Sequence, residues 1–382
     1  MNIKPIGVEE WLNELETSAT LDIAQSTIAS LTTDEILALA DDEQGGPGMG
    51  ARAFYDELGS KKQNYGWIEG SPDFKQEVAA LYQGVDGRGI DPHNVLQMNG
   101  ATGANLAVLY TLVNPGDHVV VEYPTYQPLY EIPRTLGAKV DLWRIHEEDG
   151  WQPRIEELER LVTPDTKLIC INNASNPTGT VLSREQLEAI AQIVRSVGAY
   201  VLSDEVYLPL EDRDSYCSIV DVYERGIATN SLSKTYSVPG IRIGWTVCDA
   251  ELADRLRTCR DYSLICAGSS TTPWPSTSCV IATSFWRVTA TLCSATAPSC
   301  RNGSLASRAR AGCRHAACPR RLSAWIFPWT MRRFAESCSR PVVCCWSPVV
   351  ASSCRAALAW AIARKRRHCA AVWTSFPARC AS

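Results

Sequence analysis

The stretch that decides the fold is residues 231–245, SLSKTYSVPGIRIGW, which joins two short apolar runs. These runs, Ile227–Asn230 and Ile241–Val247, are both predicted to be strands. Lys234 follows the first run among hydroxyl side chains, and Arg242 comes eight residues later. An isolated lysine is usually a solvated surface charge, but a lysine desolvated at a strand end has a lowered pKa and becomes a Schiff-base nucleophile. The stretch therefore predicts a reactive lysine.

On either side of that stretch, strand-like and helix-like segments alternate through the first 268 residues. The other strand-like runs are His118–Glu122, Leu168–Asn172 and Tyr200–Ser203, and the helix-like stretches are Gly103–Val113, Ile155–Leu161 and Ser183–Val197. Short apolar strands joined by crossover helices predict an α/β fold, with a mostly parallel sheet and flanking helices on both faces. Ligands of such folds bind at the carboxyl ends of the strands, so polar residues there are the candidates for a functional site.

Three more polar clusters stand at predicted strand ends or helix starts. Residues 99–103, NGATG, open a helix whose exposed N–H groups suit a phosphate, although most such starts are only turns. Residues 172–179, NNASNPTG, follow a buried strand, and a plain β-turn would also explain them. In residues 203–207, SDEVY, Asp204 is a carboxylate that is unfavourable to bury unpaired, and a helix N-cap is the simpler interpretation.

Together, in this order and spacing, the four clusters resemble the class I/II aminotransferases, the fold-type-I family of pyridoxal-phosphate enzymes. The resemblance covers residues 8–268, and its most specific motifs are SNPTG at 175–179 and the 231–245 stretch. It implies a fold-type-I α/β domain and a pyridoxal 5'-phosphate cofactor. It also implies an enzyme that moves an amino group between an amino acid and a 2-oxo acid.

The resemblance assigns roles to individual residues. Lys234 binds the cofactor covalently and later moves the α-proton of the substrate, and Asp204 pairs with the pyridine nitrogen and keeps it protonated. Tyr207 and Asn176 donate hydrogen bonds to the phenolic oxygen of the cofactor. The phosphate is expected to be held by Ser231, Ser233, Arg242 and the backbone of Ala101 and Thr102.

Two tyrosines complete the expected site. Tyr126, in the segment Tyr123-Pro124-Thr125-Tyr126, takes the place of the aromatic residue that stacks on the cofactor ring. Tyr65 matches the tyrosine that reaches the phosphate bound by the partner subunit. The resemblance therefore implies a homodimer with shared active sites.

The N-terminal segment departs from the family pattern. Many members have a Gly-x-Pro loop that contacts substrate, and this chain has Leu21–Ser26, LDIAQS, instead. With Trp11-Leu12, Thr33–Ile36 and Cys259–Leu264, it looks more like the capreomycidine synthase subgroup, which acts on a hydroxylated arginine. An alternative function is therefore the elimination or cyclisation of an arginine derivative on the same scaffold.

The composition changes abruptly near Gly268. Residues 1–268 hold five cysteines, 21 basic and 41 acidic residues, whereas residues 269–382 hold eleven cysteines, 16 basic residues and one acid, Glu336. The near-neutral total of −5 therefore averages two unlike segments. With 45% apolar residues, no apolar run of membrane-spanning length and an acidic N-terminus, we expect a cytoplasmic protein without a membrane or nucleic-acid partner.

The chain thus divides into an N-terminal arm with part of a small domain at 1–45, a large cofactor-binding domain at 46–268, and an aberrant tail at 269–382. In the tail the family's small domain is absent or scrambled. The first interpretation is a zinc or disulfide module, since Cys313, His315 and Cys318 lie close together, but no paired frame repeats and no metal site is expected.

The other two interpretations of the tail are a basic nucleic-acid-binding arm at Arg364–Arg367 and a frameshift. A GC-rich gene read out of frame yields an excess of Arg, Ala, Ser, Pro, Cys and Trp. When the codons of residues 269–274 are shifted to another reading frame, they can encode V-F-D-D-P-V. We favour the frameshift. If the printed tail is genuine, the chain is expected to bind the cofactor but to be inactive.

Overall fold

The structure is a computed structural model, and it describes residues 3–16, 21–22, 30–36, 51–60, 62, 64–208, 216–266 and 342–343. Residues 45–50, where the expected N-terminal arm meets the expected large domain, lie outside these residues. So does all of the tail except residues 342–343, together with the zinc, basic-arm and frameshift interpretations of it.

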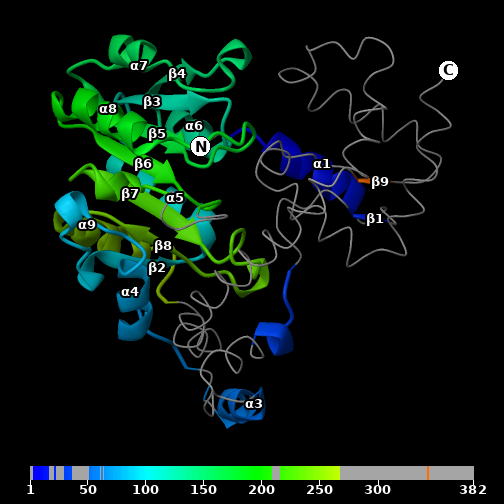
Figure 1. The fold of residues 1–382 in the computed structure, drawn as a ribbon. Coiled ribbons are helices and arrows are strands. Elements are labelled where there is room, and N and C mark those ends of the chain that lie inside the picture. Colours follow the sequence, from blue (N-terminus) through cyan, green and yellow to red (C-terminus); the bar gives the residue numbers. More distant parts are fainter. Residues whose placement is uncertain are drawn as a thin grey trace, which may run out of the picture.

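The centre of the fold is a seven-stranded sheet with the strand order β2-β8-β7-β6-β5-β3-β4, which Figure 1 shows from β4 at the top to β2 at the bottom. Its strands are β2 Val95–Met98, β3 His118–Tyr123, β4 Lys139–Arg144, β5 Thr166–Asn172, β6 Tyr200–Asp204, β7 Gly226–Ser231 and β8 Gly244–Val247. In this sheet β8 is antiparallel to both of its neighbours, β2 and β7, and all the other neighbouring strands pair in parallel. The predicted mostly parallel α/β sheet is confirmed.

Helices cover both faces of this sheet. One face packs against α4 Pro72–Ala79, α7 Ile155–Leu161 and α8 Arg184–Arg195. The other face packs against α5 Gly100–Leu112, α6 Pro128–Thr135 and α9 Ala250–Asp261. Successive strand side chains point to opposite faces, so Val201 of β6 enters the first of these cores and Leu202 the second. The central strand β6 is buried along its whole length.

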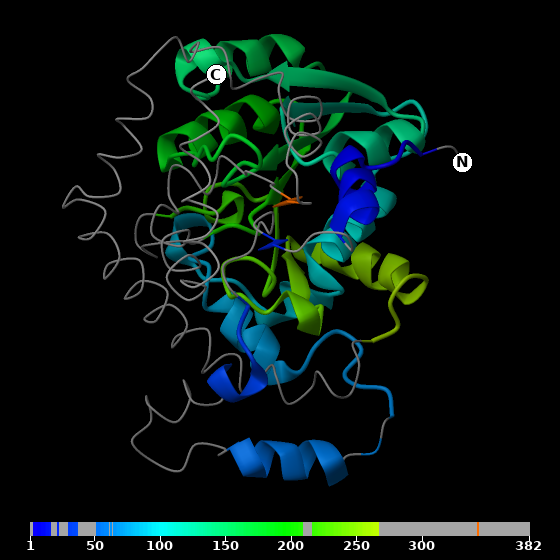
Figure 2. The same ribbon diagram turned by 90° about the vertical axis from the view of Figure 1, so that its right-hand side faces the viewer.

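The parallel strands end at one edge of the sheet, where their last residues are Tyr123, Asn172, Asp204 and Ser231. The helix α1 Gly7–Leu15 lies beyond this edge, as both ribbon views show (Figures 1 and 2). It is anchored beside α6, because Gly7 N–H donates to Gln127 Oε1 at 3.2 Å and Gln127 Nε2 donates to the Pro5 carbonyl at 2.8 Å. The carboxyl edge is thus partly covered by the N-terminal segment.

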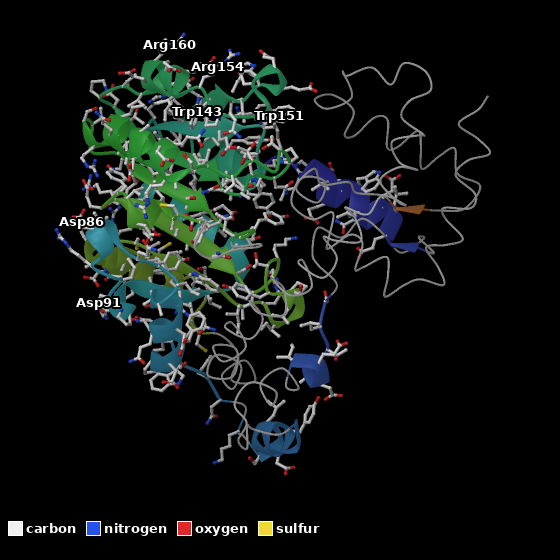
Figure 3. All side chains as sticks on the ribbon, in the orientation of Figure 1. Asp86, Asp91, Trp143, Trp151, Arg154 and Arg160 are labelled. Atoms are coloured by element: carbon white, nitrogen blue, oxygen red, sulfur yellow. The ribbon has the colours of Figure 1, made fainter. Side chains whose placement is uncertain are left out.

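The outer end of the sheet is closed by tryptophan packing. Figure 3 shows Trp143, Trp151 and Arg154 together near β4 and α7. Trp143 is buried, and its Nε1 donates to the Arg154 carbonyl at 3.1 Å. The remaining elements are α3 Ala51–Ser60 and a two-stranded parallel sheet of β1 Leu21–Asp22 and β9 Val342–Val343. In the described part of the chain, no helix has the length and apolarity needed to cross a membrane.

Two predicted boundaries are wrong. The strand predicted at Ile241–Val247 begins only at Gly244, because Pro239–Ile241 forms a 3₁₀ turn and Arg242 has a left-handed φ of +54° that cannot continue a strand. The helix predicted from Gly103 begins one turn earlier, at Gly100. The strands β2 and β4 were not predicted from the sequence.

Candidate functional site

Asp204 is the last residue of β6, and its carboxylate is buried on the α5 side of the sheet. Asn105 Nδ2 donates to its Oδ2 at 2.6 Å, and Val206 N–H donates to its Oδ1 at 3.1 Å. Asn105 is itself held by Thr229 Oγ1, which donates to Asn105 Oδ1 at 2.6 Å. Burial raises the pKa of Asp204, while the Asn105 and Val206 hydrogen bonds and the charge of Lys234 act in the opposite direction.

Residues 205–208, which directly follow Asp204, contain a turn at 206–207 and no helix. The interpretation of this carboxylate as a helix N-cap is therefore wrong. Its bond to the N–H two residues on is a local turn of the kind that aspartate favours. The carboxylate is left at the open edge of the sheet, next to a helix that supplies one amide donor.

Lys234 follows β7, and its Nζ lies 5.8 Å from the centre of the Tyr207 ring. Burial lowers the pKa of Lys234, and Arg242 lowers it further, while the charges of Glu9 and Asp204 raise it. The net direction is downward, so burial outweighs the two acids. A lysine with a lowered pKa has a larger neutral fraction near neutral pH, and the neutral amine is the nucleophile.

At the other end of the site, Arg242 stands against the N-terminus of α5. A side-chain Cβ at Gly100, whose φ is +69°, would lie 2.6 Å from Arg242 Nη2, so only glycine leaves room for the guanidinium there. Arg242 Nη1 donates to Ser233 Oγ at 3.4 Å and to the Pro239 carbonyl at 2.9 Å. A cation at the positive end of a helix is unfavourable by itself, and an anion bound between them removes the repulsion.

The backbone beside Arg242 is tightly packed. A Cβ at Gly244 would lie 2.4 Å from the Gly100 carbonyl carbon and 2.8 Å from Ala101 N, so β8 is pressed against the first turn of α5. The hydroxyl of Ser231 accepts a hydrogen bond from Ser233 N–H at 3.2 Å. The structure therefore brings Ala101, Ser231, Ser233 and Arg242 together in one cradle at the N-terminus of α5.

Tyr126 and Thr102 link the cradle to the middle of the site. The hydroxyl of Thr102, in the first turn of α5, lies 3.4 Å from the Tyr126 hydroxyl. Burial raises the pKa of Tyr126, and the acids Asp204 and Glu9 raise it as well, so its hydroxyl keeps its proton. Tyr126 is therefore a half-buried aromatic surface between the cradle and α1.

The loop after β5 contributes Asn176. The side chain of Asn172 fixes the loop, because its Nδ2 donates to the Asp204 carbonyl at 2.8 Å and its Oδ1 accepts from Asn176 N–H at 2.6 Å. Tyr65, by contrast, is 81% exposed, and no described contact ties it to this site. Of the predicted residues, Tyr65 alone is not brought to the carboxyl edge.

Sequence reasoning missed three residues of this arrangement: Asn105, Thr229 and Glu122. Asn105 carried a usable signal, because it is a fully buried polar side chain in the otherwise apolar helix α5. Thr229 lies within a predicted strand, where a threonine is ordinary. Glu122 stands at the end of β3, and its partners are far away in the sequence.

Residues 46–285 match the family described as aminotransferase class I and II. The chain is 30% identical over 245 residues to the arginine–pyruvate transaminase AruH of Pseudomonas aeruginosa, covering 63% of this chain and 62% of the relative. It is 32% identical over 182 residues to the aspartate aminotransferase of Thermotoga maritima, covering 46% and 48% of the two chains.

Among solved structures, a PLP-dependent aminotransferase from Streptococcus suis superposes with a TM-score of 0.71 at 49% identity. The match covers 78% of this chain and 76% of that one. The chain spans between about half and three fifths of the length of the two curated relatives named above. The family match extends to residue 285, past the composition change at Gly268.

Proposed function

The chain belongs to the aminotransferase class I and II family, and from that premise we propose that it is a pyridoxal-phosphate-dependent aminotransferase. In the proposed reaction an amino group moves from an amino acid to a 2-oxo acid. One observation carries the proposal: buried Asp204 and half-buried Lys234 lie at the carboxyl edge of the sheet, together with a cradle built around Arg242.

The residues present fit the cofactor. The cradle suits its phosphate, because Arg242 and the α5 N-terminus together offer a guanidinium and backbone N–H groups, and Ser231 and Ser233 add hydroxyls. Glycine at position 100 is what allows Arg242 to reach this position. When bound, pyridoxal phosphate supplies an electron sink that stabilises negative charge at the α-carbon of the substrate.

Asp204 is proposed to hold a proton on the ring nitrogen of the cofactor. The buried Asp204 carboxylate accepts two hydrogen bonds from the described residues. A further positive charge nearby would stabilise it, and a protonated ring nitrogen would supply that charge. Asn105 orients the carboxylate through Oδ2. Lys234 is proposed to bind the cofactor through Nζ and, once released, to take the α-proton on the same atom.

Three other side chains have proposed supporting roles. Asn176 and Tyr207 are proposed to donate to the phenolic oxygen of the cofactor, which is supported by the position of Asn176 beside Asn172 and of Tyr207 beside Lys234. Tyr126 is proposed to stack on the ring. Tyr65 is proposed to reach the phosphate bound by a second copy of the chain in a homodimer, and its high exposure supports this.

The test is reconstitution of the purified chain with pyridoxal 5'-phosphate. We expect an absorbance band near the visible edge and, after borohydride reduction, a mass adduct on the peptide that contains Lys234. Lys234→Ala should lose both signals, whereas Lys139→Ala, at an exposed lysine of β4, should keep both. Unchanged signals in Lys234→Ala would refute the assignment.

A second candidate is elimination or cyclisation of an arginine derivative on the same scaffold. The observation that favours an arginine-like substrate is Glu9, in the first turn of α1, whose charge acts on both Lys234 and Tyr126. With Lys234, Arg242 and Asp204 all committed to the cofactor, Glu9 is left to attract a cationic substrate side chain. The name of the relative AruH agrees with such a substrate.

The two candidates differ in their need for a 2-oxo acid. Product formed from arginine or a hydroxylated arginine without a 2-oxo acid favours elimination or cyclisation, and a strict requirement for the acceptor favours transamination. In either case Glu9→Gln should raise KM for arginine about tenfold while leaving KM for alanine unchanged. Equal changes for both amino acids would contradict the role of Glu9.

We also propose that residues 269–382 are a frameshifted replacement of the small domain and that 1–45 and 46–268 are the arm and the large domain. The composition change supports this. Resequencing across codons 265–275 tests it, and an intact frame with native-like activity would refute it. If the frame is intact and no amino acid reacts with the cofactor-loaded chain, the chain is a non-catalytic cofactor-binding protein.

A further inference from the structure

At the carboxyl edge, β3 and β5 separate before either strand ends. Their paired residues stop at Val121 and Cys170, although β3 continues to Tyr123 and β5 to Asn172. The backbone N–H of Asn172 therefore has no carbonyl of β3 opposite it. Instead, Glu122 Oε2 accepts this N–H at 2.9 Å. A side-chain carboxylate takes the place of a missing strand-to-strand hydrogen bond.

Glu122 and Asp204 lie on opposite faces of the sheet. Alternation along β3 places Glu122 with Val120 on the face covered by α7 and α8, whereas Asp204 faces α5. Its side chain is 5% exposed. It therefore acts on the site only through Asn172, whose side chain binds both the Asp204 carbonyl and Asn176 N–H.

We propose that Glu122 is a positioning residue, which holds the separated end of β5 so that Asn172 sets the places of Asn176 and Asp204. The inference rests on the proposed cofactor site. A backbone N–H forms a stronger hydrogen bond with a carboxylate than with a neutral acceptor. Leaving a buried N–H without an acceptor is unfavourable. The fixed point of the loop is thus an ionised side chain rather than the sheet itself.

The charge on Glu122 also makes this arrangement depend on pH. Burial raises the pKa of Glu122 from its ordinary 4.5 to about 7, and the hydrogen bond from Asn172 N–H acts in the opposite direction. Trp143 of β4 is its strand neighbour, and no ionised side chain of the described residues contributes to this shift. The carboxylate is therefore present above about pH 7 and is lost as pH falls through that value.

The test compares wild type with Glu122→Gln, which keeps an acceptor but no charge, and with Glu122→Ala. The measurement is the dissociation constant of pyridoxal 5'-phosphate, from quenching of tryptophan fluorescence, together with the absorbance of the loaded protein between pH 6 and 8. Glu122→Ala should bind about tenfold more weakly at pH 8. Wild type should lose affinity between pH 8 and 6 more steeply than Glu122→Gln.

The matched control is Asp221→Asn. Asp221 is also a buried carboxylate that accepts backbone N–H groups, from Gln83 and Gly84 at 2.8 Å each, but it lies in the 3₁₀ turn Ile219–Asp221, before β7. The Asp221→Asn substitution should lower the melting temperature. It should leave the cofactor affinity, and the change of that affinity with pH, as in wild type. Thermal melts of all variants separate loss of fold from loss of the site.

Two outcomes overturn the inference. One is an affinity of Glu122→Ala equal to wild type, and the other is an equal pH slope in wild type and Glu122→Gln. If wild type itself shows no cofactor binding that depends on Lys234, the proposed function fails, and this failure is distinguishable because it precedes any comparison of Glu122 variants.

Discussion

Asp204 and Glu205 are consecutive acids at the end of the same strand, yet they serve opposite sides of the molecule. Asp204 faces α5 and meets one amide, from Asn105, and one backbone N–H. Glu205 accepts from Ser218 Oγ at 3.0 Å, from Ile219 N–H at 3.1 Å and from the Tyr216 hydroxyl at 3.0 Å. Both carboxyls are buried, and burial raises the pKa of each.

The carboxyl groups of Asp204 and Glu205 differ in the hydrogen-bond donors and charges that surround them. The two oxygens of Glu205 accept from three donors in one segment, so this acid holds residues 216–219 against the end of the strand. Asp204 stands at the open edge with the cation Lys234 close enough to act on its pKa. The alternation of side chains thus directs one acid toward α5 and the proposed cofactor site, and the next toward the segment 216–219.

The largest expected effect is that of Asp204→Asn. The amide keeps an oxygen for Asn105 Nδ2 but loses the negative charge that holds the ring nitrogen protonated. We expect the rate of the amino-transfer half-reaction to fall by about 10³-fold or more. Single-turnover absorbance measures the rate, and thermal melting measures separately the stability that is lost because the Nδ2 of asparagine cannot accept the Val206 N–H. A rate within tenfold of wild type would place Asp204 with Glu205 as a structural acid.

Glu205→Gln should act on stability instead of the reaction. The pKa of Glu205 is about 8 in the folded chain against an ordinary 4.5, so the folded chain holds a proton that the unfolded chain releases between these values. The free energy of unfolding of wild type therefore falls by roughly 2 to 5 kcal/mol as pH rises through this window. Urea unfolding at pH 5 and pH 9 measures it.

In Glu205→Gln the pH dependence from this group should vanish, while the half-reaction rate stays within about threefold of wild type. A large loss of rate without loss of stability would show that the two neighbouring acids share the chemistry, and the contrast between them would fail.

The smallest expected effect on cofactor binding comes from substitutions in the hydrophobic cores on the two faces of the sheet. Leu109 of α5 and Leu187 of α8 are both fully buried, on opposite faces of the sheet. Replacing either by Ala should lower the free energy of unfolding by about 2 to 5 kcal/mol. Only Leu109→Ala should also weaken cofactor binding, by about fivefold, because α5 carries Asn105 and the turn proposed to bind the phosphate. Equal affinities in the two variants would show that the α5 core does not position the site.

Sequence patterns predicted the strand ends and their motifs well, because each motif is local. Lys234, Asp204 and Asn176 each follow an apolar run, and the structure brings all three runs to one edge. The start of β8 was missed, because the left-handed backbone of Arg242 depends on its packing against Gly100, a residue on another element. The role of Glu122 was missed for the same reason, since its partner Asn172 is 50 residues away.

The sequence by itself determined the α/β class, the family and the chemical types gathered at the strand ends, since residue type and spacing encode strand period, turn chemistry and charge. Only the tertiary structure decided which of two adjacent buried acids faces α5, which backbone N–H a separated strand leaves unpaired, and that Glu9 of α1 acts on Lys234. The physical reason is that pKa, orientation and ligand access depend on burial and on contacts between distant segments, which folding creates.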